Sequence, residues 1–140
     1  MPIQYHPKPG QVFWCDFRGN IWPEIDKKRP VVIFTPKYSQ RTDLVAVVPL
    51  STTAPPTICD FHCLLEKHPF PASAKKDEKS WAKCDLIQTV TFTRLTGYWE
   101  EVVDGKRKYL DCRISDADML KIKKAVLHGL GLSGLTQYLK

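Results

Sequence analysis

Short apolar runs alternate along the chain with breaks rich in proline, glycine and charged residues. Apolar runs of about four to eight residues bounded by such breaks are typical of β-strands. The pattern predicts two long polar loops, at 18–28 and 68–79. It predicts strands at 11–17, 31–35, 44–50 and 57–65, and another strand with a possible bulge from 80–85 and 88–91. A hairpin of 98–103 with 107–111 across an Asp104-Gly105 turn follows.

Helical periodicity appears only near the C-terminus. Apolar residues recur at helical spacing there, namely Met119, Ile122, Val126 and Leu130. Ser115 is a favoured N-cap, and Gly129 or Gly131 is suited to ending the helix. Short strands followed by one amphipathic helix predict a mainly β fold with a C-terminal α-helix, built as a small, strongly bent barrel rather than a sandwich. The length of 140 residues predicts a single domain over 1–140.

The charge balance narrows the class of partner. The net charge of +6 and the isoelectric point near 9.1 favour a polyanion, which is RNA, DNA or an acidic protein segment. No apolar run approaches the roughly 18 residues of a membrane span, and the N-terminus does not resemble a secretory signal. The cysteine count of 5 is odd and favours reduced thiols, so we expect a cytoplasmic protein without a membrane partner.

One segment, 59–63, contains the residue types of a zinc site. Structural zinc sites draw their ligands from paired clusters, and no second cluster follows. In a strand, Cys59, Phe61 and Cys63 share one face, as packed core residues do. We therefore predict no metal site, and nothing in the sequence indicates a cofactor.

The first candidate for anion binding is Arg29, at the start of the predicted strand 31–35. Pro30 follows it, and a proline at the first position of a strand removes no ladder hydrogen bond that is needed there. Arg29 is thereby held at the start of a rigid strand, where its planar guanidinium suits phosphate recognition. The alternative is a surface arginine paired with Glu24 or Asp26.

Two later strand ends carry residues of the same kind. The strand 44–50 is followed by the hydroxyls of Ser51, Thr52 and Thr53, whose alternative role is to satisfy turn backbone. Lys83 and Asp85 are two residues apart, so in a strand they share a face, and their alternative is a solvent-facing ion pair. Together the three strand ends predict a site that handles an anion.

Several motifs in this order resemble the MazF/PemK family of toxin endoribonucleases. The segment 9–17 is similar to the family's opening strand, and Arg94-Leu95 to the pair that closes a later strand. Further resemblances are the spacing of Glu24 to Arg29-Pro30, the strand end 48–52, and Lys83-Cys84-Asp85, which is similar to the "R-C-D" of the PemK/Kid branch. The terminal helix is also expected in that family.

The resemblance implies an SH3-like barrel, a homodimer, and metal-independent cleavage of single-stranded RNA. The substrate's own 2′-hydroxyl attacks the adjacent phosphorus and leaves a 2′,3′-cyclic phosphate and a 5′-hydroxyl. It also implies a cognate antitoxin, an acidic and partly disordered protein segment that lies across the RNA groove.

The resemblance also assigns roles to individual residues. Arg29 matches the family's central arginine, and Ser51 falls where a catalytic threonine is usual. Asp85 matches the aspartate base of the PemK/Kid branch, whereas Lys83 replaces its arginine acid and keeps the charge without the planar fork. Glu24 acts as a base or orients Arg29. None of the four histidines matches a motif position, so we assign them no role.

A second group of residues is expected to contact RNA. In the first loop Trp22 is the favoured stacking residue; Phe70 is a further candidate, and Trp81 more often belongs to a core. Lysines can follow the phosphate backbone or simply keep a face solvated. The predicted RNA contacts are Thr52, Thr53, Trp22, Lys27, Lys28 and Gln88, with Lys75, Lys76 and Lys79 as further cations.

Two alternatives stay open. One is a barrel that binds nucleic acid or a partner without cutting. The other is a poison of DNA gyrase, because CcdB, a toxin of the same fold, acts on that enzyme, and a shared fold does not decide function. That activity would depend on the C-terminal segment 134–140 rather than on the strand ends.

Overall fold

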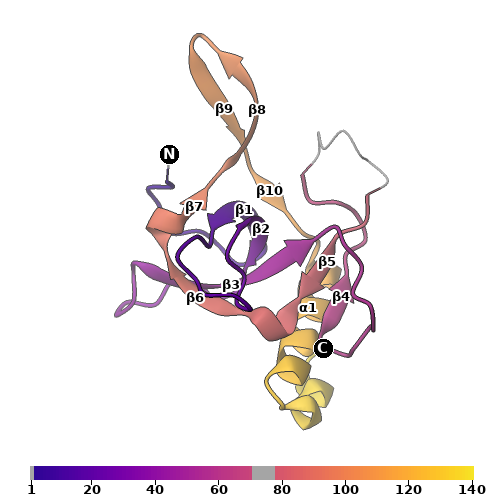
Figure 1. The fold of residues 1–140 in the computed structure, drawn as a ribbon. Coiled ribbons are helices and arrows are strands. Elements are labelled where there is room, and N and C mark those ends of the chain that lie inside the picture. Colours follow the sequence, from indigo (N-terminus) through magenta and orange to yellow (C-terminus); the bar gives the residue numbers. More distant parts are fainter. Residues whose placement is uncertain (1, 71–77) are drawn as a thin grey trace.

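A computed structural model describes residues 2–70 and 78–140 (Figure 1). Its main feature is an 8-stranded antiparallel sheet in the order β10-β1-β2-β3-β5-β4, to which β6 adds by pairing with β3 and β7 by pairing with β1. The strands of this sheet are β1 (Gln11–Asp16), β2 (Lys28–Ile33), β3 (Leu44–Ser51), β4 (His62–Leu64), β5 (Trp81–Lys83), β6 (Gln88–Thr91), β7 (Leu95–Thr96) and β10 (Cys112–Arg113).

The sheet bends because β3 changes partners along its length. Its first half pairs with β6 through Leu44–Val47, and Val47 to Pro49 pair with β2. Its last residues, Leu50 and Ser51, pair instead with β5. The β2–β3 ladder therefore ends at the pair of Val31 and Pro49, and the two strands diverge beyond it.

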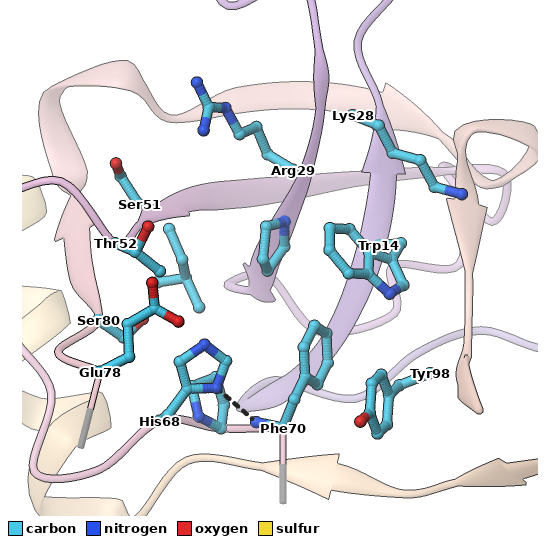
Figure 2. A pocket seen from close by; sticks show the side chains of 13 residues that line it. Trp14, Lys28, Arg29, Ser51, Thr52, His68, Phe70, Glu78, Ser80 and Tyr98 are labelled. Carbon is cyan, nitrogen blue, oxygen red and sulfur yellow. Dashed lines mark hydrogen bonds between the residues drawn. The ribbon is translucent and has the colours of Figure 1, made fainter. Parts of the chain in front are cut away.

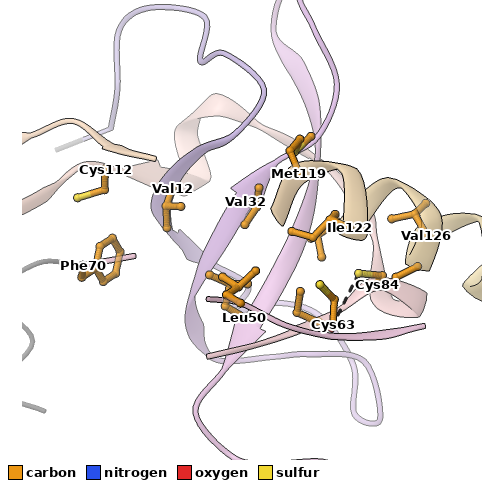
Figure 3. Close-up of a cluster of buried hydrophobic side chains, with 14 residues drawn as sticks. Val12, Val32, Leu50, Cys63, Phe70, Cys84, Cys112, Met119, Ile122 and Val126 are labelled. Carbon is orange, nitrogen blue, oxygen red and sulfur yellow. Dashed lines mark hydrogen bonds between the residues drawn. The ribbon is translucent and has the colours of Figure 1, made fainter. Parts of the chain in front are cut away.

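Apolar side chains pack on both faces of the bent sheet, which explains why its central strands read as continuous apolar runs. In β2, Val31 and Ile33 belong to one buried cluster, and Val32 belongs to the other. The second cluster is covered by the helix α1 (Asp116–Gly129), which contributes Met119 and Ile122 to it (Figure 3). This arrangement confirms the predicted mainly β fold with a C-terminal helix.

The predicted N-cap of α1 is confirmed. Ser115 Oγ accepts a hydrogen bond from the backbone N–H of Asp118 at 3.0 Å. The buried Asp118 carboxylate accepts in turn from the N–H of Glu66 at 3.0 Å, and it pairs with Lys121 at 3.2 Å. Leu130, predicted to lie on the apolar face, is instead 55% exposed because it is the C-cap. A 3₁₀ helix that the sequence did not predict, η3 (Ser133–Tyr138), follows it.

Three predicted strand boundaries are wrong. β2 begins at Lys28, so Pro30 is its third residue, paired with Trp14, and not its first. β4 is only three residues long, because the N–H of Cys59 donates to His62 Nδ1 at 2.9 Å and closes a turn before the strand. β5 ends at Lys83, and Asp85 lies in a 3₁₀ turn, η1 (Cys84–Leu86).

The predicted hairpin is present as β8 (Tyr98–Val103) and β9 (Lys106–Leu110). Both turn residues have positive φ, 51° at Asp104 and 76° at Gly105, as a type I′ turn requires. The hairpin forms a 2-stranded sheet of its own and projects from the main sheet (Figure 1). The short strands β7 and β10 flank it and were not predicted.

Cys15, Cys63, Cys84 and Cys112 are buried free thiols, and Cys59 is half-buried. Burial raises the pKa of Cys15 to about 12 and that of Cys112 to about 11, which keeps both protonated at neutral pH. In the described part of the chain, no helix has both the length and the apolar character needed to cross a membrane.

The packing of α1 against η1 gives a testable prediction. A Cβ at Gly129 would lie 2.8 Å from Asp85 Cα, so the backbone has to move. Gly→Ala near a helix end normally stabilises by up to about 1 kcal/mol, but overpacking costs about 1–3 kcal/mol. We expect Gly129→Ala to lower the free energy of unfolding by about 1–2 kcal/mol in urea titrations.

Gly134→Ala is the matched control, because a Cβ there meets no atom within 4 Å. Its free energy of unfolding should stay within about 0.5 kcal/mol of the wild type. If Gly129→Ala were as stable as Gly134→Ala, the described contact of α1 with η1 would be wrong.

Candidate functional site

The loop between β1 and β2 is anchored at its start by Arg94. The guanidinium Nη1 of Arg94 donates to the carbonyl oxygens of Asp16 at 2.7 Å and of Arg18 at 3.0 Å. The Asp16 carboxylate accepts from Arg18 Nη2 at 2.6 Å and from the backbone N–H of Arg18 at 3.0 Å, and these two hydrogen bonds from Arg18 hold the pKa of Asp16 at about 2. The Arg94-Leu95 motif thus has a structural role that its place in the sequence did not reveal.

A second set of hydrogen bonds closes the same loop. Asn20 Nδ2 donates to the carbonyl of Ile25 at 2.9 Å and to Gln88 Oε1 at 3.0 Å. Glu24 Oε1 accepts from the N–H of Ile21 at 2.7 Å. These contacts fix the approach of the chain to the start of β2, where Lys28 and Arg29 lie.

A cleft of about 380 Å³ opens where β2 and β3 diverge (Figure 2). Pro30 and Leu50 come from the two diverging strands, and the N-terminal end of β2 and the C-terminal end of β3 form its rim. One wall carries the polar side chains of Arg29, Ser51, Thr52, Glu78 and Ser80, and the other carries the rings of Trp14, Phe70 and Tyr98, with Lys28 beside Trp14. His68 lies between the two walls, next to Phe70 (Figure 2).

The aromatic wall is a connected stack. The Phe70 and Tyr98 rings are 4.3 Å apart and nearly parallel, at 7°, and Trp14 lies 5.3 Å from Phe70. Lys28 Nζ lies 5.8 Å from the Trp14 ring, within cation–π distance. Phe70, a predicted stacking residue, is only 4% exposed, and Trp81 is a core residue at 8%. Trp14 and Tyr98 are the half-exposed rings at the cleft.

Arg29 is the cation of the polar wall and lies at the rim of the cleft (Figure 2). It is half-buried, lies opposite Cys15 in the β1–β2 ladder, and points over the cleft (Figure 2). Within residues 2–70 and 78–140, Arg29 forms no ion pair with Glu24, with Asp26 or with any other acid. Its five N–H donors are therefore available to an anion.

The hydroxyls at the end of β3 differ in their surroundings. Ser51 Oγ accepts from the N–H of Thr53 at 3.1 Å and so satisfies turn backbone. Thr52 is exposed, lines the cleft, and has no hydrogen-bond partner among the described side chains. Thr53 is exposed and does not line it. Thr52 is therefore the better placed hydroxyl donor.

The remaining predicted site residues lie outside the cleft. Trp22 is 80% exposed in the first loop, and Lys27 is exposed there too. Asp85 is exposed beside Gly129. Lys75 and Lys76 lie outside the described residues. The predicted residues that do not line the cleft are Glu24, Trp22, Lys27, Thr53, Lys83, Asp85 and Gln88.

Two residues at the cleft were missed. His68 and Glu78 come from the ends of the second predicted loop, which has no periodicity to place its side chains. No sequence signal singled them out, because the burial of Phe70 and Ser80, two residues after His68 and Glu78, is seen only in the structure. No cluster of three or more metal-binding side chains occurs in the parts of the chain that the structure describes.

A family model describing PemK-like, MazF-like toxins of type II toxin–antitoxin systems matches residues 8–130. The chain belongs to this family. The toxin is 26% identical over 144 residues to an uncharacterized protein of Haemophilus influenzae, with 94% of this chain and 95% of that protein covered.

Solved structures share the fold of this toxin. MazF from Deinococcus radiodurans superposes with a TM-score of 0.65 at 18% identity, covering 91% of this chain and 99% of that one. An endoribonuclease from a mycobacterial species, in complex with its cognate antitoxin, has a TM-score of 0.59 at 23% identity and covers 90% and 96%. The predicted fold class is therefore confirmed.

The hydrogen bonds of Asn20 generate a prediction for the first loop. Asn20→Ala removes both contacts of its side-chain amide, each worth about 0.5–1.5 kcal/mol. We expect hydrogen exchange of the amides at 21–27 to become about tenfold faster, with the core strands unchanged. Gln40→Ala is the matched control in another exposed loop. Equal exchange in both variants would contradict the anchoring role of Asn20.

Proposed function

We propose that this toxin is an endoribonuclease that cleaves single-stranded RNA without a metal ion. The observation that carries the proposal is the unpaired Arg29 at the rim of a cleft that has an aromatic wall opposite. A cation beside stacking surfaces matches the two recurring parts of an unpaired nucleotide, its phosphate and its base. Family membership and the endoribonucleases among the structural neighbours support the same reaction class.

The proposed reaction uses the 2′-hydroxyl of the substrate. The 2′-oxygen loses its proton and forms a bond to phosphorus, and the bond from phosphorus to the 5′-oxygen breaks. The products are a 2′,3′-cyclic phosphate and a 5′-hydroxyl. DNA has no 2′-hydroxyl and would not be cut.

Arg29 would stabilise the charge that builds on the phosphorane oxygens. Removing one such donor in other enzymes costs about 2.7–4 kcal/mol, which corresponds to about 10²–10³ in rate. Thr52 would donate a second hydrogen bond to the phosphorane. Ser51, in the position of the family's threonine, would then support the turn that presents Thr52.

Base binding is proposed for the aromatic wall, where Trp14 and Tyr98 offer their exposed ring surface. Lys28 would contact the phosphate next to the bound base. We propose that Trp22, Lys27 and Thr53 contact the part of the RNA that extends beyond the cleft. We likewise propose that four further residues either position other site residues or contact RNA outside the cleft, because none of them lines it. These are Glu24, Lys83, Asp85 and Gln88.

We also propose that the toxin forms a homodimer, acts on RNA in the cytoplasm, and is inhibited by a cognate antitoxin with an acidic segment. MazE–MazF complexes from Deinococcus radiodurans and the mycobacterial complex support the antitoxin. The net charge of +6 complements both the antitoxin and RNA.

The test is incubation of the purified toxin with single-stranded RNA in excess EDTA. We expect cuts that leave cyclic phosphate and 5′-hydroxyl ends, and an Arg29→Ala rate about 10²–10³ lower. Arg41→Ala, the matched control, removes an exposed arginine outside the cleft and should cut within about threefold of the wild type. An RNA with a single 2′-deoxy position at the cut site should resist cleavage there.

Failure of the folded wild type to cut any RNA, with or without added divalent metal, would contradict the proposal. The non-cutting barrel and the gyrase-directed toxin would then be separated by substituting 134–140, which should abolish toxicity only for the latter. If cleavage needs divalent metal, the assignment as a nuclease stands and the metal-independent mechanism is refuted.

A further inference from the structure

The proposed reaction needs a group that removes the proton of the 2′-hydroxyl. The acids that the sequence singled out, Glu24 and Asp85, do not line the cleft. Among the described residues that do, Glu78 is the only carboxylate and His68 the only imidazole. The cleft therefore contains acid–base groups of its own, and neither matches a motif of the sequence.

The strand register places Glu78 near the hydroxyl end of β3. Trp81 pairs with Ser51, so the chain before β5 runs past the end of β3 towards Thr52. The Glu78 carboxylate points into the cleft between Thr52 and His68 (Figure 2). Glu78 is half-buried and makes no hydrogen bond or ion pair within the described ranges, so its oxygens are available as acceptors.

His68 is oriented by the backbone of the aromatic wall. Its Nδ1 accepts a hydrogen bond from the N–H of Phe70 at 3.2 Å, and Phe70 is fixed by its stack with Tyr98. When Nδ1 accepts, the neutral ring carries its proton on Nε2. The imidazole therefore offers an N–H donor beside the Glu78 carboxylate and across from Arg29.

We propose that Glu78 is the general base of this toxin and that His68 binds the substrate by donating from Nε2 to the bound phosphate. The inference rests on the proposed ribonuclease function and deepens it. The 2′-hydroxyl proton passes to the Glu78 carboxylate as the bond from the 2′-oxygen to phosphorus forms. The bond from phosphorus to the 5′-oxygen breaks, and the 5′-oxygen takes a proton from water.

The charges of the cleft suit this assignment. A carboxylate near a phosphate is repelled by it, and the repulsion is offset when cations line the same cleft. Arg29 and Lys28 provide those cations here. A base on one side of the phosphate and a guanidinium on another is the arrangement that a 2′-hydroxyl attack requires.

The test compares Glu78→Gln with Glu100→Gln, a control on the exposed hairpin strand β8. Under single-turnover conditions with saturating RNA, Glu78→Gln should cut about 10²–10⁴ times more slowly, the range for loss of a general base. Its affinity for the 2′-deoxy RNA should stay within about threefold of the wild type, because the amide keeps the side chain's size and removes a repelled charge. Glu100→Gln should match the wild type in both.

His68 is tested by two replacements, each of which keeps a polar group at the position of only one of the two ring nitrogens. The side-chain amide of His68→Gln reaches about as far as Nε2 and retains a donor there, whereas that of His68→Asn reaches only to the position of Nδ1. We expect His68→Gln to cut within about tenfold of the wild type, and His68→Asn to be as slow as His68→Ala. Equal loss in both amide variants would overturn the role of Nε2.

The failures of the two proposals are distinguishable. If the wild type cuts RNA and Arg29→Ala does not, the proposed function stands. A folded Glu78→Gln that cuts within threefold of the wild type would then overturn only the assignment of the base. If the wild type cuts nothing, both proposals fall together.

Discussion

The early end of the β2–β3 ladder is the constraint on which the cleft depends. The two strands part after Val31 and Pro49, and both carry a proline at this point, in Pro30 and Pro49. Proline has no backbone N–H, and the nitrogen of Pro30 faces β3, because Phe34, four residues further on, donates its N–H to Ala46 of β3. The ladder therefore cannot continue with a donor at Pro30. β3 completes its pairing with β5 instead, and the start of β2 is left facing open space. The path of the backbone therefore opens the cleft, and the side chains line its walls.

The aromatic wall joins this cleft to the core. Phe70 belongs to the buried cluster that α1 covers, and it is also the middle ring of the stack that Trp14 and Tyr98 present to the cleft. The backbone N–H of the same residue orients His68. Folding and site geometry therefore depend on one side chain, and a substitution at Phe70 would change both together.

What the sequence predicted well depended on periodicity and local chemistry. Short apolar runs between polar breaks identified the strands of the core, Ser115 marked the start of the helix, and Asp104-Gly105 marked the hairpin turn. Arg29 was found because it borders an apolar run. Strand periodicity failed for Asp85, since β5 stops at Lys83 and a 3₁₀ turn redirects the next residues. Glu78 and His68 could not be predicted because the position of a loop side chain depends on tertiary contacts.

The hairpin of β8 and β9 differs from the rest of the fold in the contacts that stabilise it. It shares no strand pairing with the main sheet, and its side chains from Trp99 to Tyr109 are exposed. Its local contacts are the Arg107 guanidinium over the Trp99 ring at 4.6 Å and the pair of Lys108 with Glu101 at 3.5 Å. Exposed two-stranded units of this kind contribute little to global stability. Selection on binding can therefore reshape this arm, in length or in sequence, while the barrel that bears the cleft stays intact.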